Sequence, residues 1–239
     1  VNLHLPNTLE TVGDNAFREC SGIVDLHLPD TLNRIEAFAF AGCSGIVVLH
    51  LPDALTAISE GAFYECSGIV DIHFPDALNT IGDMAFEECS GIVDLHLPDT
   101  LWCIGDFAFE KCSGIVNLHL PDALETIGYK AFTDCSGIIN LHLPNALEID
   151  DFAFAECTSL RRVLVPDTLV KGNSAKATKV FAGCPVLAVG LAPSSSVPLP
   201  RRTFWHPTMH AFCTPGQRDC VIAVLVSELR SDRQEEEEG

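Results

Sequence analysis

Hydrophobic and polar residues follow one another along most of this chain in a pattern that keeps returning. In one unit, residues 23–44, the positions expected to face inward are separated by mostly polar or small residues: Ile23, Leu26, Leu28, Leu32, Ile35, Phe40 and Cys43. The stretch Val24-Asp25-Leu26-His27-Leu28 alternates with a period of two. It predicts a short strand whose leucines face inward and whose Asp25 and His27 face outward.

The rest of the unit is expected to complete a coil around one core. The letters PDTL, residues 29–32, predict a turn, because proline has a preset φ angle and aspartate can bond to its own backbone. A second short extended piece is expected through Leu32 and Ile35. A single helical or 3₁₀ turn is expected after it, at AFAGC, residues 39–43.

The unit recurs with a period of 23 residues, apart from one step of 22 and a last step of 27, which indicates stacked units that cannot bury their apolar faces alone. One column consists of histidines: His4, His27, His50, His73, His96, His119 and His142. Two more consist of phenylalanines and cysteines: Phe17, Phe40, Phe63, Phe86, Phe109, Phe132, Phe154 and Phe181, and Cys20, Cys43, Cys66, Cys89, Cys112, Cys135, Cys157 and Cys184. Eight units therefore fill residues 1–187.

These columns carry a family resemblance. The stretch LHLPDALETIGYKAFTDCSGI, residues 118–138, resembles the BspA-like class of leucine-rich repeats. The resemblance implies an open, curved solenoid with a parallel sheet along one side, and a role in adhesion or protein binding rather than catalysis. Outward strand positions in that family are usually Thr, Ser or Lys, so the histidine column belongs to this sequence, and Leu164 takes its place in the last unit.

The predicted fold class is thus a leucine-rich-repeat solenoid, with a parallel β-sheet on one side, turns and short helical or extended pieces on the other, and a short helical C-terminal tail. Residues 1–187 are expected to form the solenoid and residues 188–202, rich in Pro and Ser, a linker. Residues 203–230 are expected to form a helical tail module. Residues 231–239, with four consecutive glutamates, are expected to be an acidic, disordered end.

The acidic excess of the repeats limits the class of partner that the chain is expected to bind. Residues 1–157 contain 4 Lys and Arg against 25 Asp and Glu. Nucleic-acid binding requires clustered Lys and Arg and is therefore disfavoured, whereas a protein with a basic surface is favoured. No run of about 18 apolar residues suggests a membrane span.

The histidines are expected to form a ladder on the exposed face of the sheet, with strands about 4.8 Å apart. Rows of Asp and Asn run beside it, at Asn2, Asp25, Asp71, Asp94, Asn117 and Asn140, with Val48 interrupting them, and at Asn7, Asp30, Asp53, Asp76, Asp99, Asp122 and Asn145. The residues proposed to bind a protein partner are His27, His50, His73, His96, His119, His142, Asp25, Asp71 and Asp94.

Two other interpretations of the ladder stay open. Residues 21–32 are identical to residues 90–101, so the histidines could be copied surface residues without a role. Imidazoles and carboxylates also bind zinc, nickel or copper, which makes a metal-binding or pH-responsive surface the alternative function. Regular rows do not by themselves make a closed tetrahedral site, so no metal site and no cofactor are assigned.

The cysteines and the tail complete the predictions. The eight inward cysteines are interpreted as small buried hydrophobes without disulfides, which slightly favours the cytoplasm. A secreted or surface location stays open because the chain starts inside a unit without methionine. In the tail, His206, His210, Cys213 and Cys220 do not follow a known zinc spacing, and the alternative is that Trp205 and Phe212 dock a helix.

Catalysis is not expected. The sequence lacks a Gly-rich phosphate loop, a nucleophile elbow and an acid–base pair that stands out from the repeats.

Overall fold

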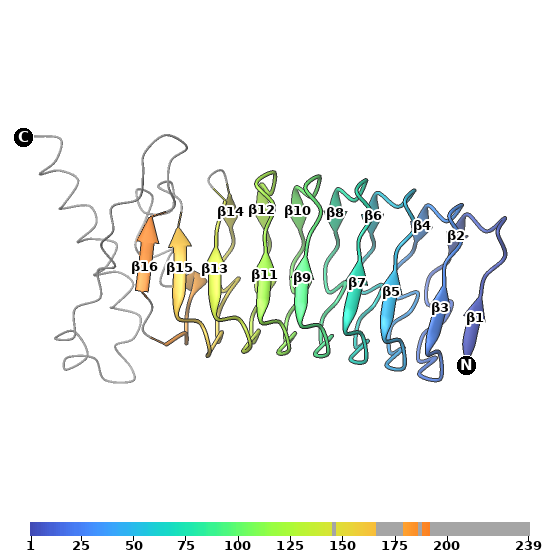
Figure 1. The fold of residues 1–239 in the computed structure, drawn as a ribbon, viewed down its shortest axis with the longest axis horizontal. Coiled ribbons are helices and arrows are strands. Elements are labelled where there is room, and N and C mark those ends of the chain that lie inside the picture. Colours follow the sequence, from blue (N-terminus) through green and yellow to red (C-terminus); the bar gives the residue numbers. More distant parts are fainter. Residues whose placement is uncertain (145–146, 166–178, 186–187, 192–239) are drawn as a thin grey trace, which may run out of the picture.

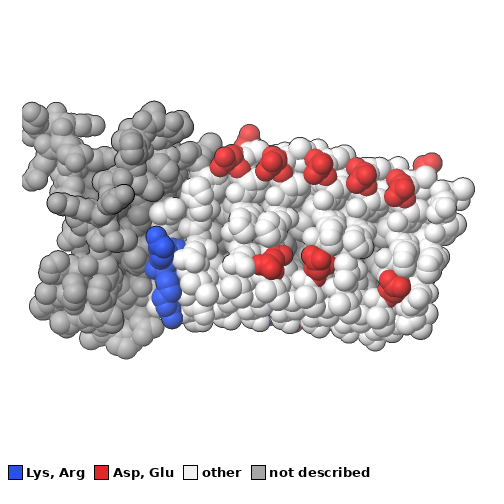
Figure 2. Space-filling view, viewed as in Figure 1, with Lys and Arg blue, Asp and Glu red and all other residues white. Residues whose placement is uncertain are grey.

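The computed structural model describes residues 1–144, 147–165, 179–185 and 188–191, and shows a row of coils stacked side by side (Figure 1). Each coil contributes one strand to the same side: β1 (Asn2–His4), β3 (Asp25–His27), β5 (Val48–His50), β7 (Asp71–His73), β9 (Asp94–His96), β11 (Asn117–His119), β13 (Asn140–His142), β15 (Arg162–Val165) and β16 (Ala188–Leu191). Acidic side chains lie in two rows on this side (Figure 2). The predicted solenoid of stacked coils is confirmed.

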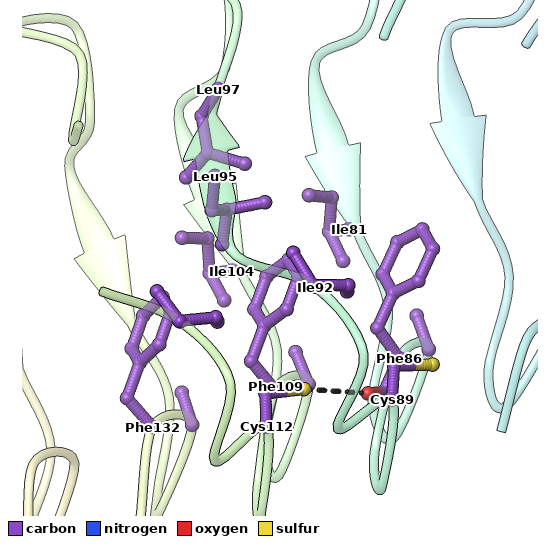
Figure 3. Packing of buried hydrophobic residues seen from close by; sticks show 14 of the residues in the cluster. Ile81, Phe86, Cys89, Ile92, Leu95, Leu97, Ile104, Phe109, Cys112 and Phe132 are labelled. Carbon is purple, nitrogen blue, oxygen red and sulfur yellow. Dashed lines mark hydrogen bonds between the residues drawn. The ribbon is translucent and has the colours of Figure 1, made fainter. Parts of the chain in front are cut away.

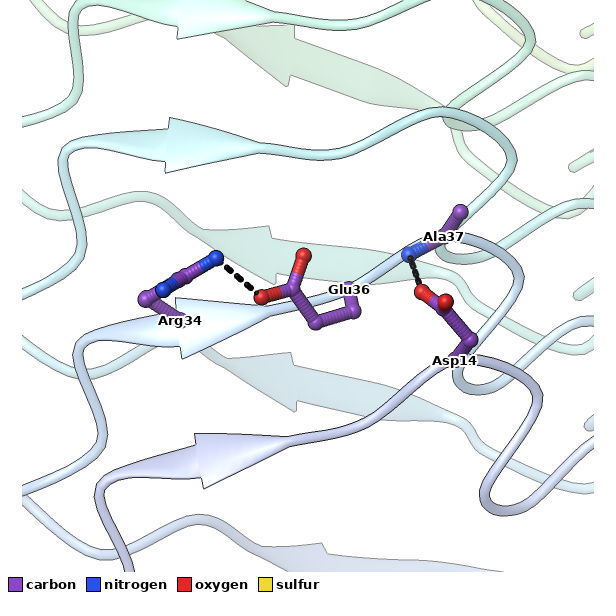
Figure 4. Close-up of polar contacts among 4 residues, drawn as sticks. All are labelled: Asp14, Arg34, Glu36 and Ala37. Carbon is purple, nitrogen blue, oxygen red and sulfur yellow. Dashed lines mark hydrogen bonds and ion pairs between the residues drawn. The ribbon is translucent and has the colours of Figure 1, made fainter.

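A second row of strands, of two residues each, follows the turn after each Leu-His-Leu-Pro stretch. These strands are β2 (Thr11–Val12), β4 (Arg34–Ile35), β6 (Ala57–Ile58), β8 (Thr80–Ile81), β10 (Cys103–Ile104), β12 (Thr126–Ile127) and β14 (Glu148–Ile149). Side chains also join neighbouring coils here, since Asp14 Oδ1 accepts a hydrogen bond of 3.1 Å from the Ala37 amide of the next coil (Figure 4). Strand β4 confirms the second extended piece that the sequence predicted through Leu32 and Ile35.

All strand pairs are parallel and in repeat register, so that Leu95 lies opposite Leu118 and His96 opposite His119. The sheet on the histidine side is not continuous, however. It consists of β1–β3, β5–β7 and β9–β11–β13–β15–β16. The sequence predicted one parallel sheet, because a 23-residue period sets the register of neighbouring coils but does not determine which of them complete their backbone hydrogen bonds.

Phenylalanine rings form the spine of the core. Adjacent rings of the column from Phe17 to Phe181 stack with centroids 5.1 to 5.9 Å apart. Ring Phe86 is fully buried between Phe63 and Phe109, and Ile92 and Leu95 pack nearby (Figure 3). The inward assignment of this column is confirmed.

The cysteine column lies beside the phenylalanines and is buried from Cys43 onward. Each buried thiol donates to the carbonyl of a phenylalanine in the preceding coil, as Cys112 Sγ does to Phe86 O at 3.0 Å (Figure 3). Burial raises the pKa of the Cys43 thiol to about 11, so the thiol stays protonated as a donor. The nine cysteines of the described residues are free, as predicted, but Cys20 is exposed because no coil covers the outer side of the first one.

The segment expected to be helical or 3₁₀ at residues 39–43 is neither. Its amides alternate between two directions: Ala41 N bonds to Phe38 O within the turn, and Phe40 N bonds to Ala62 O in the next coil. Left-handed residues produce this alternation, with φ of 54° at Phe38 and 75° at Gly42. A right-handed helix cannot contain them, so the segment forms successive turns that also bond coil to coil.

The sheet of the solenoid continues past residue 187. Strand β16 pairs with β15 from Arg162↔Ala188 to Val165↔Leu191, so the sheet extends four residues into the segment expected to be a linker. The predicted helical tail and acidic end, residues 203–239, lie outside the described residues.

Candidate protein-binding face

The strands of the histidine side expose their first and last residues and bury the middle one. In β9, Leu95 is fully buried whereas Asp94 and His96 are exposed, and the same pattern occurs in β3, β5, β7, β11 and β13. The sequence places these side chains correctly because alternate residues of a strand point to opposite faces. All nine candidate residues therefore lie on one exposed face.

The histidines stack in pairs rather than as a uniform ladder. Ring centroids are 4.3 Å apart for His4–His27, 4.2 Å for His50–His73 and 4.4 Å for His96–His119. Each pair belongs to two strands that share a backbone ladder. His142 lies opposite Leu164, so the seventh histidine has an aliphatic neighbour on its C-terminal side.

Carboxylates stand beside two of these pairs. Asp25 Oδ1 is 3.8 Å from His27 Nδ1, and Asp71 Oδ2 is 3.9 Å from His73 Nε2. These distances are too long for hydrogen bonds, and more than half of each side chain is exposed. The contacts would become ion pairs on protonation of the imidazoles, and water would screen them strongly.

The face has opposite charges at its two ends. Asp30, Asp53, Asp76, Asp99 and Asp122 are exposed at the turns that follow the strands, which adds a second acidic row to Asp25, Asp71 and Asp94. Arg161 and Arg162 are exposed on the coil of β15, and Figure 2 shows one basic cluster on this face, at its C-terminal end. Most of the face is therefore acidic, and its basic groups gather at one end.

The geometry does not favour a closed metal site. Stacked imidazoles present ring faces to each other rather than nitrogens to a common point. Among the residues that the structure describes, no group of three or more His, Cys, Asp or Glu side chains is placed to hold a metal ion. The four zinc candidates of the tail, His206, His210, Cys213 and Cys220, lie outside the described residues.

Sequence reasoning missed an exposed apolar row that runs immediately before the histidine-side strands. Residues one position before each strand are roughly half exposed: Val24 51%, Val47 43%, Val70 47%, Val93 41%, Val116 37% and Ile139 41%. Alternation did not reveal this row, because Val24 lies two residues before the buried Leu26 and would therefore be expected to point inward. We call these six residues the valine ridge.

The chain belongs to the BspA type leucine-rich repeat family. The model of a BspA type leucine rich repeat region, with six copies, matches residues 1–101 and 79–205. The resemblance stated from the sequence is thereby confirmed. Proteins of this kind are generally non-catalytic repeat scaffolds. A comparison with curated proteins finds no match.

Two solved structures support this assignment. A leucine-rich repeat protein from Bacteroides ovatus is 31% identical, with a TM-score of 0.61 over 65% of this chain and 41% of its own. The leucine-rich repeat protein of T. pallidum is 28% identical, with a TM-score of 0.56 over 66% of this chain and 72% of its own. The chain thus spans about two fifths of the Bacteroides protein. Within the described residues, no helix has the length and hydropathy needed to cross a membrane.

Proposed function

We propose that this chain is a non-catalytic scaffold that binds a protein partner with a basic surface through its acidic, histidine-lined strand face. The observation that carries the proposal is the outward, in-register placement of His27 to His142 with Asp25, Asp71 and Asp94. The core is complete without these side chains, because the buried residues come from the other strand positions and from the turns. An extended regular surface is what repeat solenoids use to bind partners.

Electrostatics supports the choice of a basic partner. Residues 1–157 carry 25 acidic against 4 basic side chains, which produces a negative field that steers cationic surfaces towards the chain. Exposed charges are screened beyond about 8 Å at physiological ionic strength, so association should slow as salt is added. A histidine-lined face adds sensitivity near neutral pH, since imidazole is the side chain that gains charge there.

The test is a selection of protein ligands from a displayed random library on the immobilised full chain. Selected ligands are then measured against Asp71→Asn with Asp94→Asn, and against Glu125→Gln with Glu148→Gln, a control with the same charge change among exposed residues of the second strand row. We expect basic ligands whose binding weakens in the first variant only and with added salt. Ligands that bind both variants equally and ignore salt would contradict the proposal.

The alternative function is a metal-binding or pH-responsive surface. The stacked rings do not form a metal site as they stand, but the three histidine pairs have centroids only 4.2 to 4.4 Å apart, so a rotamer change would bring two imidazole nitrogens to one ion. Metal binding needs neutral imidazoles and releases protons, so it should strengthen between about pH 5.5 and 7.5. Zinc or nickel is titrated by calorimetry into the chain and into a triple variant, His73→Thr, His96→Thr, His119→Thr. Binding that disappears in the triple variant supports the alternative, and heat that survives it contradicts it.

A further inference from the structure

The apolar side chains exposed on this solenoid are concentrated in one place. Nine large hydrophobic residues of the described chain are exposed: Val1, Val24, Val47, Val48, Val70, Val93, Trp102, Val116 and Ile139. All except Trp102 lie in the column of the valine ridge or, for Val48, immediately beside it. Single exposed apolar residues are ordinary on protein surfaces, but a contiguous row bordered by polar groups marks an interaction site.

The ridge is held rigidly. Val70 N donates to Val47 O at 2.9 Å and Val116 N to Val93 O at 2.9 Å, so the backbone of the ridge itself joins neighbouring coils. The side chains are β-branched and have few rotamers. A partner that covers the ridge would therefore lose little conformational entropy on the solenoid side.

The ridge also has defined borders. Asp25, Asp71 and Asp94 follow ridge residues directly and are exposed beside it. At the C-terminal end the ridge stops at Ile139, whose carbonyl accepts from the amide of Arg161, the exposed residue that takes the ridge position in the next coil. An occupant must therefore combine an apolar stripe with positive charges along one side.

The spacing of the ridge selects the shape of that occupant. Ridge residues repeat once per coil, about every 4.8 Å. Side chains on one face of an extended strand repeat about every 6.7 Å and would lose register within two coils. An α-helix presents a side chain to the same line about every 5.4 Å, a mismatch of about 0.6 Å per coil against about 1.9 Å for a strand.

We propose that the valine ridge binds an amphipathic, cationic α-helix of a protein partner, lying along the solenoid axis with its apolar stripe on the valines and Lys or Arg towards Asp25, Asp71 and Asp94. From Val24 to Ile139 the ridge spans five coil steps, about 24 Å. That length matches about 16 helical residues. The inference rests on the proposed function and deepens it, because it names the element of the partner that the face recognises.

Other occupants fit the charges less well. A second copy of the chain would place a surface with the same acidic excess against the first, and the two surfaces would repel each other. A lipid bilayer with anionic headgroups would be repelled by the same carboxylates. Both occupants are therefore outcomes that would overturn the proposal.

The test uses the full chain and a synthetic helical peptide of about 18 residues with leucines on one face and lysines beside them, together with a scrambled peptide of identical composition. The ridge variant is Val70→Thr, Val93→Thr, Val116→Thr, in which each side chain keeps its shape and its preference for extended structure. Trp102→Ser is the control, since Trp102 is 44% exposed and lies outside the ridge. Melting curves verify that each variant is folded.

We expect the amphipathic peptide to bind the chain more tightly than the scrambled one, and the ridge variant to lose about tenfold in affinity while the control stays unchanged. Equal binding of both peptides, weakened only by Asp71→Asn with Asp94→Asn, would overturn the helix proposal and leave the acidic face intact. If neither peptide binds but library ligands do, the helix proposal is overturned and the acidic face is again left intact. The proposal would also be overturned if the chain binds phosphatidylserine vesicles or forms dimers, and if the ridge variant loses that binding or dimerisation.

Discussion

The first coil and the central coils contain the same motif but do not have the same core. Phe86 and Cys89 are fully buried, whereas the corresponding Phe17 is half-buried and Cys20 is exposed. The difference is the neighbour, since each central coil is covered by a described coil on either side and the first on one side only. Burial in this solenoid is thus a property of adjacent coils and not of the repeat sequence, as expected where stability is a sum of nearest-neighbour terms.

The phenylalanine column should show this difference most strongly. Phe86→Ala removes a ring that stacks on Phe63 and Phe109 at 5.4 and 5.3 Å, and should destabilise the chain by about 3–5 kcal/mol. Phe17→Ala removes a ring with one stacking partner, Phe40, and should cost about half as much. Thermal melting of both variants measures the two losses of stability. Equal losses would mean that the coils do not share one core.

Glycine provides a second comparison of the same kind. A Cβ at Gly91 would lie 2.6 Å from the carbonyl oxygens of Ile69 and Ser67, which are backbone atoms of the preceding coil. A Cβ at the equivalent Gly22 would meet nothing within 4 Å. Gly91→Ala should therefore force two coils apart and cost about 2–3 kcal/mol, while Gly22→Ala should be neutral within about 0.5 kcal/mol. Denaturant unfolding distinguishes them, and a harmless Gly91→Ala would contradict the close approach of the coils.

A buried carboxyl provides a smaller, pH-dependent effect. Burial, and then the neighbouring carboxyl of Glu110, raise the pKa of Glu87 to about 7. Because the folded pKa lies above the unfolded one, the folded state holds the proton between the two values, and stability falls as pH rises from about 4 towards 7. Glu87→Gln should therefore stabilise the chain by about 1 kcal/mol at pH 8 and have no effect at pH 4.

The matched control for this effect is Glu88→Gln. Glu88 Oε1 is 2.6 Å from Lys111 Nζ on the next coil, so its loss should not stabilise the chain at any pH. Stability curves against pH provide the comparison. A Glu87→Gln variant that is less stable than the parent at pH 8 would show that the carboxylate is satisfied there and not penalised.

The repeat sequence predicted what depends on period and alternation. The 23-residue spacing places His96 on His119 and Leu95 on Leu118, and the strand pattern separates Asp94 and His96 from Leu95. The repeat sequence could not predict details for which several conformations have nearly equal energy and the contacts between neighbouring coils decide. Examples are the pairing of the histidine rings and the left-handed φ of 62° at Glu88, a residue type with no preference for that conformation.

The candidate site divides in the same way. The position and exposure of His27, His96 and Asp94 followed from alternation, and the structure places them as expected. The valine ridge was overlooked because Val93 was not among the residues to which the repeat pattern gave a role, and strict alternation would turn it inward with Leu95, two residues later. The structure separates them, with Leu95 fully buried and Val93 41% exposed.

The smallest expected effect lies on the histidine face and separates binding from folding. His96 is exposed and contributes a ring stacked on His119 at 4.4 Å, while the buried Leu95 beside it holds the coil in place. His96→Thr keeps an outward residue with good strand preference, so the free energy of unfolding should change by less than about 0.5 kcal/mol. Urea unfolding of both variants gives the comparison with Phe86→Ala. A loss as large as that of Phe86→Ala would mean that the histidine column is part of the core; a small loss leaves its side chains free to serve a partner.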